Sequence, residues 1–201
     1  MGRTRMTGDE RREQILDVAH AIVDAEGFHA ATPRRVAEAA GVTRTVLYQQ
    51  FGDMAGLFVT LIDRESALAV HQYLDAFAGL SDGVRDDPFL SAFEAAVRAV
   101  DGHPATWRLF LLPAEGAPPL LYERLAERQE AVQKVMEANL VEEYPGLADP
   151  EYIARAVHAS GRELLRLRLT DPEGATVERL IDAVRTLRTF VPVSRAGDGG
   201  A

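Results

Sequence analysis

Apolar residues recur every three or four positions along most of this chain, a spacing that places them on one face of a helix. The first run lies on one such face: Ile15, Val18, Ala19, Ile22 and Val23. Thr7 and Glu10 precede this run with the spacing of a capping box, and Gly27 ends it. Further runs of the same kind follow, and no segment alternates convincingly as a strand does. We therefore predict an all-α protein of about nine helices.

Residues 33–51 have the pattern of two short helices joined by a tight corner. Thr32 can cap the first helix, whose first residue is a proline that has no N–H to lose there. Gly41 ends this helix, Thr43 can cap the second, and Leu47 would hold the second helix on a small shared core. The segment predicts a helix-turn-helix, although a helical hairpin of another kind of protein would carry similar signals.

The second of these helices leaves a set of side chains exposed that suits a DNA major groove: Arg44, Thr45, Val46, Tyr48 and Gln49. An arginine can bond a guanine edge, a glutamine an adenine edge, and an exposed valine a thymine methyl group. On this interpretation Arg44, Thr45 and Gln49 contact bases, whereas Thr32, Thr43 and Tyr48 contact the backbone. The candidate DNA-binding residues are Thr32, Arg34, Thr43, Arg44, Thr45, Val46, Tyr48 and Gln49.

From about Arg12 to about Glu65 the order of motifs resembles the N-terminal domain of the TetR family of transcriptional regulators. The motifs are the helix 15–23, the turn Glu26-Gly27-Phe28, Thr32 with Val36-Ala37, Ala40-Gly41-Val42, and Leu47 to Phe51 followed by Leu57-Phe58. The resemblance implies a homodimeric, ligand-responsive DNA-binding protein, usually a repressor, with DNA contacts at Thr32, Arg44, Thr45, Tyr48 and Gln49. Met54 stands where many members carry a lysine, which puts one phosphate contact in question.

The pattern divides the chain into a helix-turn-helix DNA-binding domain, residues 1–52, and a larger helical ligand-binding and dimerisation domain, residues 53–194. A tail, residues 195–201, is expected to be disordered. The net charge of -9 lies in the larger part, because residues 1–50 hold seven basic and seven acidic residues, which leaves 15 basic and 24 acidic residues elsewhere. Because the N-terminal part is neutral and the rest of the chain is acidic, only the N-terminal part can approach DNA phosphates without strong repulsion. The basic start, with Arg3, Arg5, Arg11 and Arg12, could add DNA contacts or simply be solvated.

The middle of the chain, roughly residues 54–145, carries most of the aromatic side chains, which are typical of small-molecule sites between helices. The alternative is that they form packed core. The short helix 104–112 and the proline-bounded loop after it could line or gate a cavity. The candidate ligand-binding residues are Tyr73, Phe77, Phe93, His103, Trp107, Phe110 and Met136.

Two long amphipathic helices, at about residues 150–169 and 173–190, end the chain. Asp149 and Asp171 each stand before a proline and are predicted to cap them. Two such helices from each of two subunits would form a four-helix dimer interface, although both apolar faces could also be buried within one subunit. A dimer would place two DNA-reading helices about 34–36 Å apart, the repeat of the major groove.

Several other classes of protein lack support. The chain has no cysteine, no glycine-rich phosphate loop and no HExxH or GxSxG motif, so no enzyme, cofactor or metal site is predicted. No apolar run of about 18 residues or signal sequence is seen, so we expect a cytoplasmic protein without a membrane partner.

The sequence favours a repressor that binds a pseudo-palindromic operator as a homodimer and is released by an unidentified small molecule. The alternatives are a DNA-binding regulator without an effector and a helical protein-interaction module.

Overall fold

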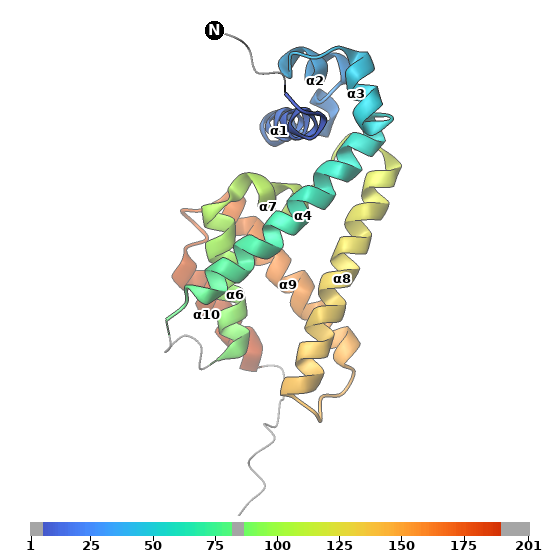
Figure 1. Cartoon of the computed structure of the whole chain (residues 1–201). Helices are drawn as coiled ribbons and strands as arrows, with labels where there is room; N and C mark the ends of the chain where they lie inside the picture. The colour runs from blue at the N-terminus through green and yellow to red at the C-terminus, as the bar shows by residue number, and fades with distance from the viewer. Residues whose placement is uncertain (1–5, 82–86, 190–201) are drawn as a thin grey trace, which may run out of the picture. The chain divides into compact units, whose positions relative to one another are not determined.

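The computed structural model describes residues 6–81 and 87–189, and within these ranges every regular element is a helix (Figure 1). The all-α prediction is therefore confirmed. None of the described helices is long and apolar enough to cross a membrane. Some of our predictions fall outside the described ranges: those for residues 3 and 5, for the end of the last helix and of the larger domain at residues 190–194, and for the tail 195–201. The helices are α1 (Gly8–Glu26), the short η1 (Phe28–Ala30), α2 (Pro33–Ala39), α3 (Arg44–Phe51), α4 (Met54–Ala78), α6 (Pro88–Gly102), α7 (Pro104–Leu111), α8 (Pro119–Glu143), α9 (Pro150–Thr170) and α10 (Val177–Thr189).

The chain forms two compact units, and two helices contribute to both. The N-terminal unit comprises Met1–Ala67 and Leu112–Ala126, and the C-terminal unit comprises Leu68–Leu111 and Glu127–Ala201. Both α4 and α8 therefore run from one unit into the other, since the boundaries fall inside these helices.

The N-terminal unit is held together by apolar side chains from its first four α-helices. On the face predicted for α1, Val18 is half-buried and the other four residues are buried, with Ile15 and Ala19 fully inaccessible. From η1, Phe28 packs edge-on against Phe58 of α4, with ring centroids 5.2 Å apart. The other buried apolar residues of this core are Val36 and Ala37 of α2, Leu47 and Phe51 of α3, and Leu57, Phe58, Leu61 and Ile62 of α4.

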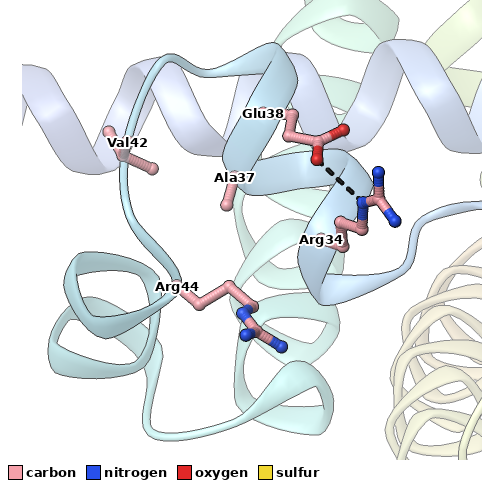
Figure 2. A pocket seen from close by; sticks show the side chains of 5 residues that line it. All are labelled: Arg34, Ala37, Glu38, Val42 and Arg44. Atoms are coloured by element: carbon pink, nitrogen blue, oxygen red, sulfur yellow. Dashed lines mark hydrogen bonds and ion pairs between the residues drawn. The ribbon is translucent and has the colours of Figure 1, made fainter.

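The corner between α2 and α3 forms through the local signals that the sequence carries. The Thr32 hydroxyl accepts the N–H of Arg35 and the Thr43 hydroxyl accepts that of Val46, each at 3.3 Å, so both predicted caps are present. Gly41 has φ 63°, a left-handed conformation that glycine adopts at little cost. Beyond it, the N–H of Val42 donates to the carbonyl of residue 37 at 2.9 Å. Figure 2 shows this corner from close by.

A buried carboxylate links α1 and α4 within the N-terminal unit. Glu65 is only 1% exposed, and Nε and Nη2 of Arg64 donate to its Oε1 at 3.1 and 2.9 Å. The Nδ1 atom of His20 lies 3.3 Å from the same oxygen. Nη1 of Arg64 also donates to Glu13 and Asp17 of α1, at 3.1 and 2.7 Å. These contacts offset the cost of burying the charge of Glu65.

The segment 112–126, which includes the start of α8, is fastened to the same unit by specific bonds. Nε and Nη2 of Arg124 donate to the two carboxylate oxygens of Asp63 at 2.7 and 2.8 Å, which is a bidentate ion pair with α4. The Tyr122 hydroxyl donates to the carbonyl of Ala114 at 2.7 Å and so stabilises the turn before α8. The proline-bounded loop that we predicted to gate a cavity therefore belongs to the N-terminal unit.

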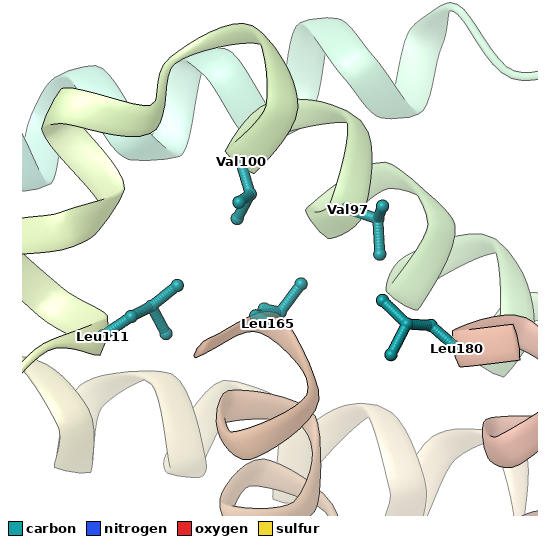
Figure 3. Close-up of a cluster of buried hydrophobic side chains, with 5 residues drawn as sticks. All are labelled: Val97, Val100, Leu111, Leu165 and Leu180. Carbon is teal, nitrogen blue, oxygen red and sulfur yellow. The ribbon is translucent and has the colours of Figure 1, made fainter. Parts of the chain in front are cut away.

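The C-terminal unit has its own core, to which four helices contribute. Figure 3 shows the side chains that meet there: Val97 and Val100 of α6, Leu111 of α7, Leu165 of α9 and Leu180 of α10. Phe93 and Trp107 are partly buried against this cluster. The apolar faces of the last two helices thus contribute at least Leu165 and Leu180 to the core of a single subunit.

Two predicted helix caps are wrong in detail. The last helix begins at Val177 and not at residue 173, because the Asp171 carboxylate accepts the N–H of Gly174 at 2.9 Å and forms a turn. Thr176 takes the capping role, since its hydroxyl accepts the N–H of Arg179 at 3.3 Å. Helix α9 begins at Pro150 as predicted, but Asp149 has a left-handed φ of 50° and its side chain makes no capping bond.

Candidate nucleic-acid interface

Helix α3 has one buried side and one exposed side. Its core contacts come from Leu47 and Phe51, whose spacing of four residues places them on one face. The predicted DNA-binding residues lie at the surface: Thr43, Arg44, Thr45, Val46, Tyr48 and Gln49, of which Val46 is half-buried and Tyr48 is 42% exposed. Within residues 6–81 and 87–189, no side chain bonds to those of Arg44, Thr45 or Gln49. These groups are free to contact another molecule.

An open depression lies between α2 and α3 beside these exposed groups. It measures about 480 Å³ and is lined by Arg34, Ala37, Glu38, Val42 and Arg44 (Figure 2). The Nε atom of Arg34 donates to Oε1 of Glu38 at 2.8 Å, although the two side chains are 82% and 65% exposed. This hydrogen bond raises the pKa of the Arg34 guanidinium above its ordinary value. Thr32, at the start of α2, is exposed as well.

The charges around the depression suit an anion. Arg34 and Arg44 bring two guanidinium groups to it and Glu38 brings one carboxylate, so the lining carries one net positive charge. Guanidinium groups form strong charge-assisted bonds with phosphate oxygens. A phosphate of a nucleic-acid backbone therefore fits this surface electrostatically, while the neighbouring face of α3 offers groups that can bond base edges.

Glu38 is a residue that our sequence reasoning missed at this surface. We expect Glu38→Gln to strengthen binding to any DNA roughly fivefold, because one negative charge near a phosphate opposes binding by about 1 kcal/mol and also occupies Arg34. Fluorescence anisotropy with labelled duplexes over a range of salt concentrations measures the effect. Glu130→Gln is the control, since Glu130 forms an exposed i,i+4 pair with Lys134 in the C-terminal unit. Equal affinities for the two variants would contradict the prediction.

A comparison with sequence models of protein families matches this same region. Residues 15–61 match the sequence model of the bacterial regulatory proteins of the tetR family. This range spans most of α1, all of α2 and α3, and the beginning of α4. This helix-turn-helix region is that of the TetR family of transcriptional regulators.

Two relatives each match the chain over about 30% of its length. It is 38% identical over 60 residues to the HTH-type transcriptional activator FasR of Mycolicibacterium smegmatis, which is 30% of this chain and 27% of FasR. It is 36% identical over 64 residues to the HTH-type transcriptional repressor AcnR of Corynebacterium efficiens, which is 30% of this chain and 34% of AcnR. The chain thus matches about a third or less of each relative's length. One of these relatives is named an activator and the other a repressor.

The likeness to solved structures extends over nearly the whole fold. The crystal structure of NalD, the secondary repressor of the MexAB-OprM multidrug efflux pump in Pseudomonas aeruginosa, superimposes with a TM-score of 0.67. The match covers 96% of this chain and 98% of NalD at 19% sequence identity. At that identity the match shows that the two chains share a fold.

The ligand-binding residues that we predicted all lie in the C-terminal unit. Phe93 and Trp107 pack against its core cluster, and Nε1 of Trp107 donates to Oε1 of Gln72 at 3.1 Å. Gln72 is a partner that the sequence did not reveal. The other predicted residues are Tyr73, Phe77, Phe110 and Met136, which are half-buried, and His103, which is exposed at the end of α6.

Tyr73 and Phe77 form a tilted aromatic pair on α4, with ring centroids 6.2 Å apart. Burial raises the pKa of the Tyr73 hydroxyl, which therefore stays protonated and able to donate a hydrogen bond. No group of three or more histidine, aspartate or glutamate side chains among the described residues could hold a metal ion.

Proposed function

We propose that this protein is a homodimeric regulator that binds double-stranded DNA through α2 and α3 and responds to a small molecule in its C-terminal unit. The observation that carries the proposal is the exposed, unbonded set Arg44, Thr45 and Gln49 next to a depression that favours an anion. With α3 in the major groove, these three side chains contact base edges. The hydroxyl groups of Thr32, Thr43 and Tyr48 then contact the backbone on either side.

A dimer is proposed because one such helix contacts few base pairs, whereas two copies can contact successive major grooves of a pseudo-palindromic operator. The pairing surface is assigned to α9 and α10. Small exposed residues on α9, Ala156, Ala159 and Ser160, would let two helices approach closely, and Leu187 of α10 is also exposed. A stable monomer in sedimentation experiments at micromolar concentration would contradict this assignment.

Regulation by a small molecule is proposed to act through α4, which runs from one unit into the other. The molecule would bind among Tyr73, Phe77 and the other predicted residues, and its binding would change how well the two α3 helices fit one operator. Such a ligand acts only through unequal affinity for the two conformations, and a coupling of about 1–3 kcal/mol is the usual scale. Bound to its operator, the dimer would block transcription, and the ligand would release it.

The central test is Arg44→Ala. It should weaken binding at the cognate operator by about 1–3 kcal/mol and relax the base preference at one position, because the arginine bonds a base edge. The operator is obtained by selecting bound fragments from genomic DNA, and affinity is then measured on single-base variants of the best fragment. Lys134→Ala, at an exposed position of α8, is the control for loss of one positive charge. Unchanged operator affinity and base preference would remove Arg44 from the interface.

A broader outcome would count against the whole proposal. Electrostatic binding to DNA weakens steeply as salt rises, because each phosphate contact releases counterions. If the wild-type protein bound no genomic fragment at low salt, the DNA-binding function itself would be wrong.

A further inference from the structure

Arg12 of α1 bonds to the far end of the DNA-reading helix. Its Nη1 donates a hydrogen bond to the main-chain carbonyl of Gln50, which is 38 residues further along the chain. Its Nη2 donates to the Thr60 hydroxyl of α4 at 3.3 Å, and its guanidinium carbon lies 4.4 Å from the centroid of the Phe51 ring. One side chain thus joins α1 to both α3 and α4. For Arg12, the alternative that the basic N-terminal residues are simply solvated is therefore wrong.

The contact falls where α3 most needs a partner. The last four carbonyl groups of a helix have no donor within it, and the carbonyl end carries partial negative charge. Helix α3 is eight residues long and ends at Gly52, whose φ is 78°. So short a helix is marginal by itself and depends on its tertiary contacts. An arginine at its carbonyl end supplies a hydrogen bond, a favourable charge and a cation–π contact with Phe51.

Thr60 extends this arrangement into α4. Its hydroxyl accepts from Arg12 and donates to the Gly56 carbonyl at 2.8 Å, so the acceptor is itself oriented. The end of α3 is therefore held from two directions, by α1 through the arginine and by α4 through the oriented hydroxyl. An arginine that only balanced nearby surface charge would not need bonds to both α3 and α4.

We infer that Arg12 is a positioning residue for DNA recognition, which fixes the direction of α3 by capping Gln50, covering Phe51 and reaching Thr60. The inference rests on the proposed function. Base contacts by Arg44, Thr45 and Gln49 require a helix held in one direction, since hydrogen bonds to base edges weaken steeply with misalignment. Phosphate contacts tolerate more freedom. Loss of Arg12 should therefore cost discrimination between sequences more than it costs general affinity for DNA.

The test compares Arg12→Met with Arg11→Met. Both remove one positive charge from adjacent positions of α1, and no described residue bonds to the Arg11 side chain. For a fragment selected from genomic DNA, Arg12→Met should bind about 10-fold more weakly than Arg11→Met, the effect of losing a hydrogen bond to a charged group. For an unrelated duplex the two variants should bind alike, with the same dependence on salt. Arg12→Lys, which keeps a charge and a donor, should recover part of the selectivity.

Hydrogen exchange of the free protein tests the same inference without DNA. Amides of residues 48–51 should exchange faster in Arg12→Met than in Arg11→Met, while amides of α9 should be unchanged in both. Equal exchange and equal selectivity in the two variants would overturn the inference and leave the proposed function standing. Absence of DNA binding by the wild-type protein would overturn the proposed function, and with it any role of Arg12 in DNA recognition.

Discussion

Leu47→Ala is expected to lower the free energy of unfolding of the N-terminal unit by about 2–5 kcal/mol, the range found when a buried leucine is truncated to alanine. Leu47 is fully inaccessible and lies at the centre of α3, between the exposed residues that we assign to DNA. Removing its side chain leaves a cavity under a helix of only two turns. DNA binding should therefore weaken as well, although Leu47 itself cannot reach the duplex.

The measurement has to separate the two units. Hydrogen exchange of residues 33–51 reports on the N-terminal unit, whereas the chain's single tryptophan, Trp107, lies in the C-terminal unit and reports on it by fluorescence. Gln49→Ala is the control, because Gln49 is exposed on the same helix and its loss should leave the free energy of unfolding nearly unchanged. If Leu47→Ala exchanged no faster than Gln49→Ala across residues 33–51, Leu47 would not be part of the core.

Arg64→Met should destabilise the same unit by about 3 kcal/mol, at the lower end of the range for breaking a buried ion pair. The variant keeps most of the side-chain volume but leaves the carboxylate of Glu65 buried without the guanidinium that now pairs with it. It also removes the two bonds from Arg64 to Glu13 and Asp17, which join α4 to α1. We expect a value at the lower end of that range because the Arg64 side chain is 19% exposed, so water partly screens its charge.

Two controls show whether the buried charge is the cause. The double variant with Arg64→Met and Glu65→Leu should recover much of the lost free energy, since the buried carboxylate is then removed together with its guanidinium partner. Arg166→Met breaks an exposed pair with Glu163 and should cost less than about 1 kcal/mol. Hydrogen exchange of α1 and of residues 54–67 gives the values for the Arg64 variants in the N-terminal unit, and hydrogen exchange of α9 gives the value for Arg166→Met. If Arg64→Met alone cost no more free energy of unfolding than Arg166→Met, the burial of Glu65 would not depend on its ion pair with Arg64.

The sequence by itself determined the elements whose causes are local. Thr32 and Thr43 cap α2 and α3 through bonds three residues away, and Gly41 ends α2, so nearby residues suffice to predict both helices. The division of α3 into a buried and an exposed side follows in the same way from helical spacing, which is why the pattern of residues alone assigns Leu47 to the core and Arg44 to the surface.

Only the tertiary structure decided the contacts between residues far apart in the chain. From the sequence, Arg12 could contact DNA or be solvated, yet it caps Gln50, because the packing of α1 brings the two together. The pairing of Arg64 and Glu65 with α1 depends on that packing too. Even a local signal can be ambiguous, since Asp171 forms a turn where the pattern favoured a cap. Helical spacing defines which side of a helix is buried, but which partner meets a charged side chain depends on how the helices pack in three dimensions.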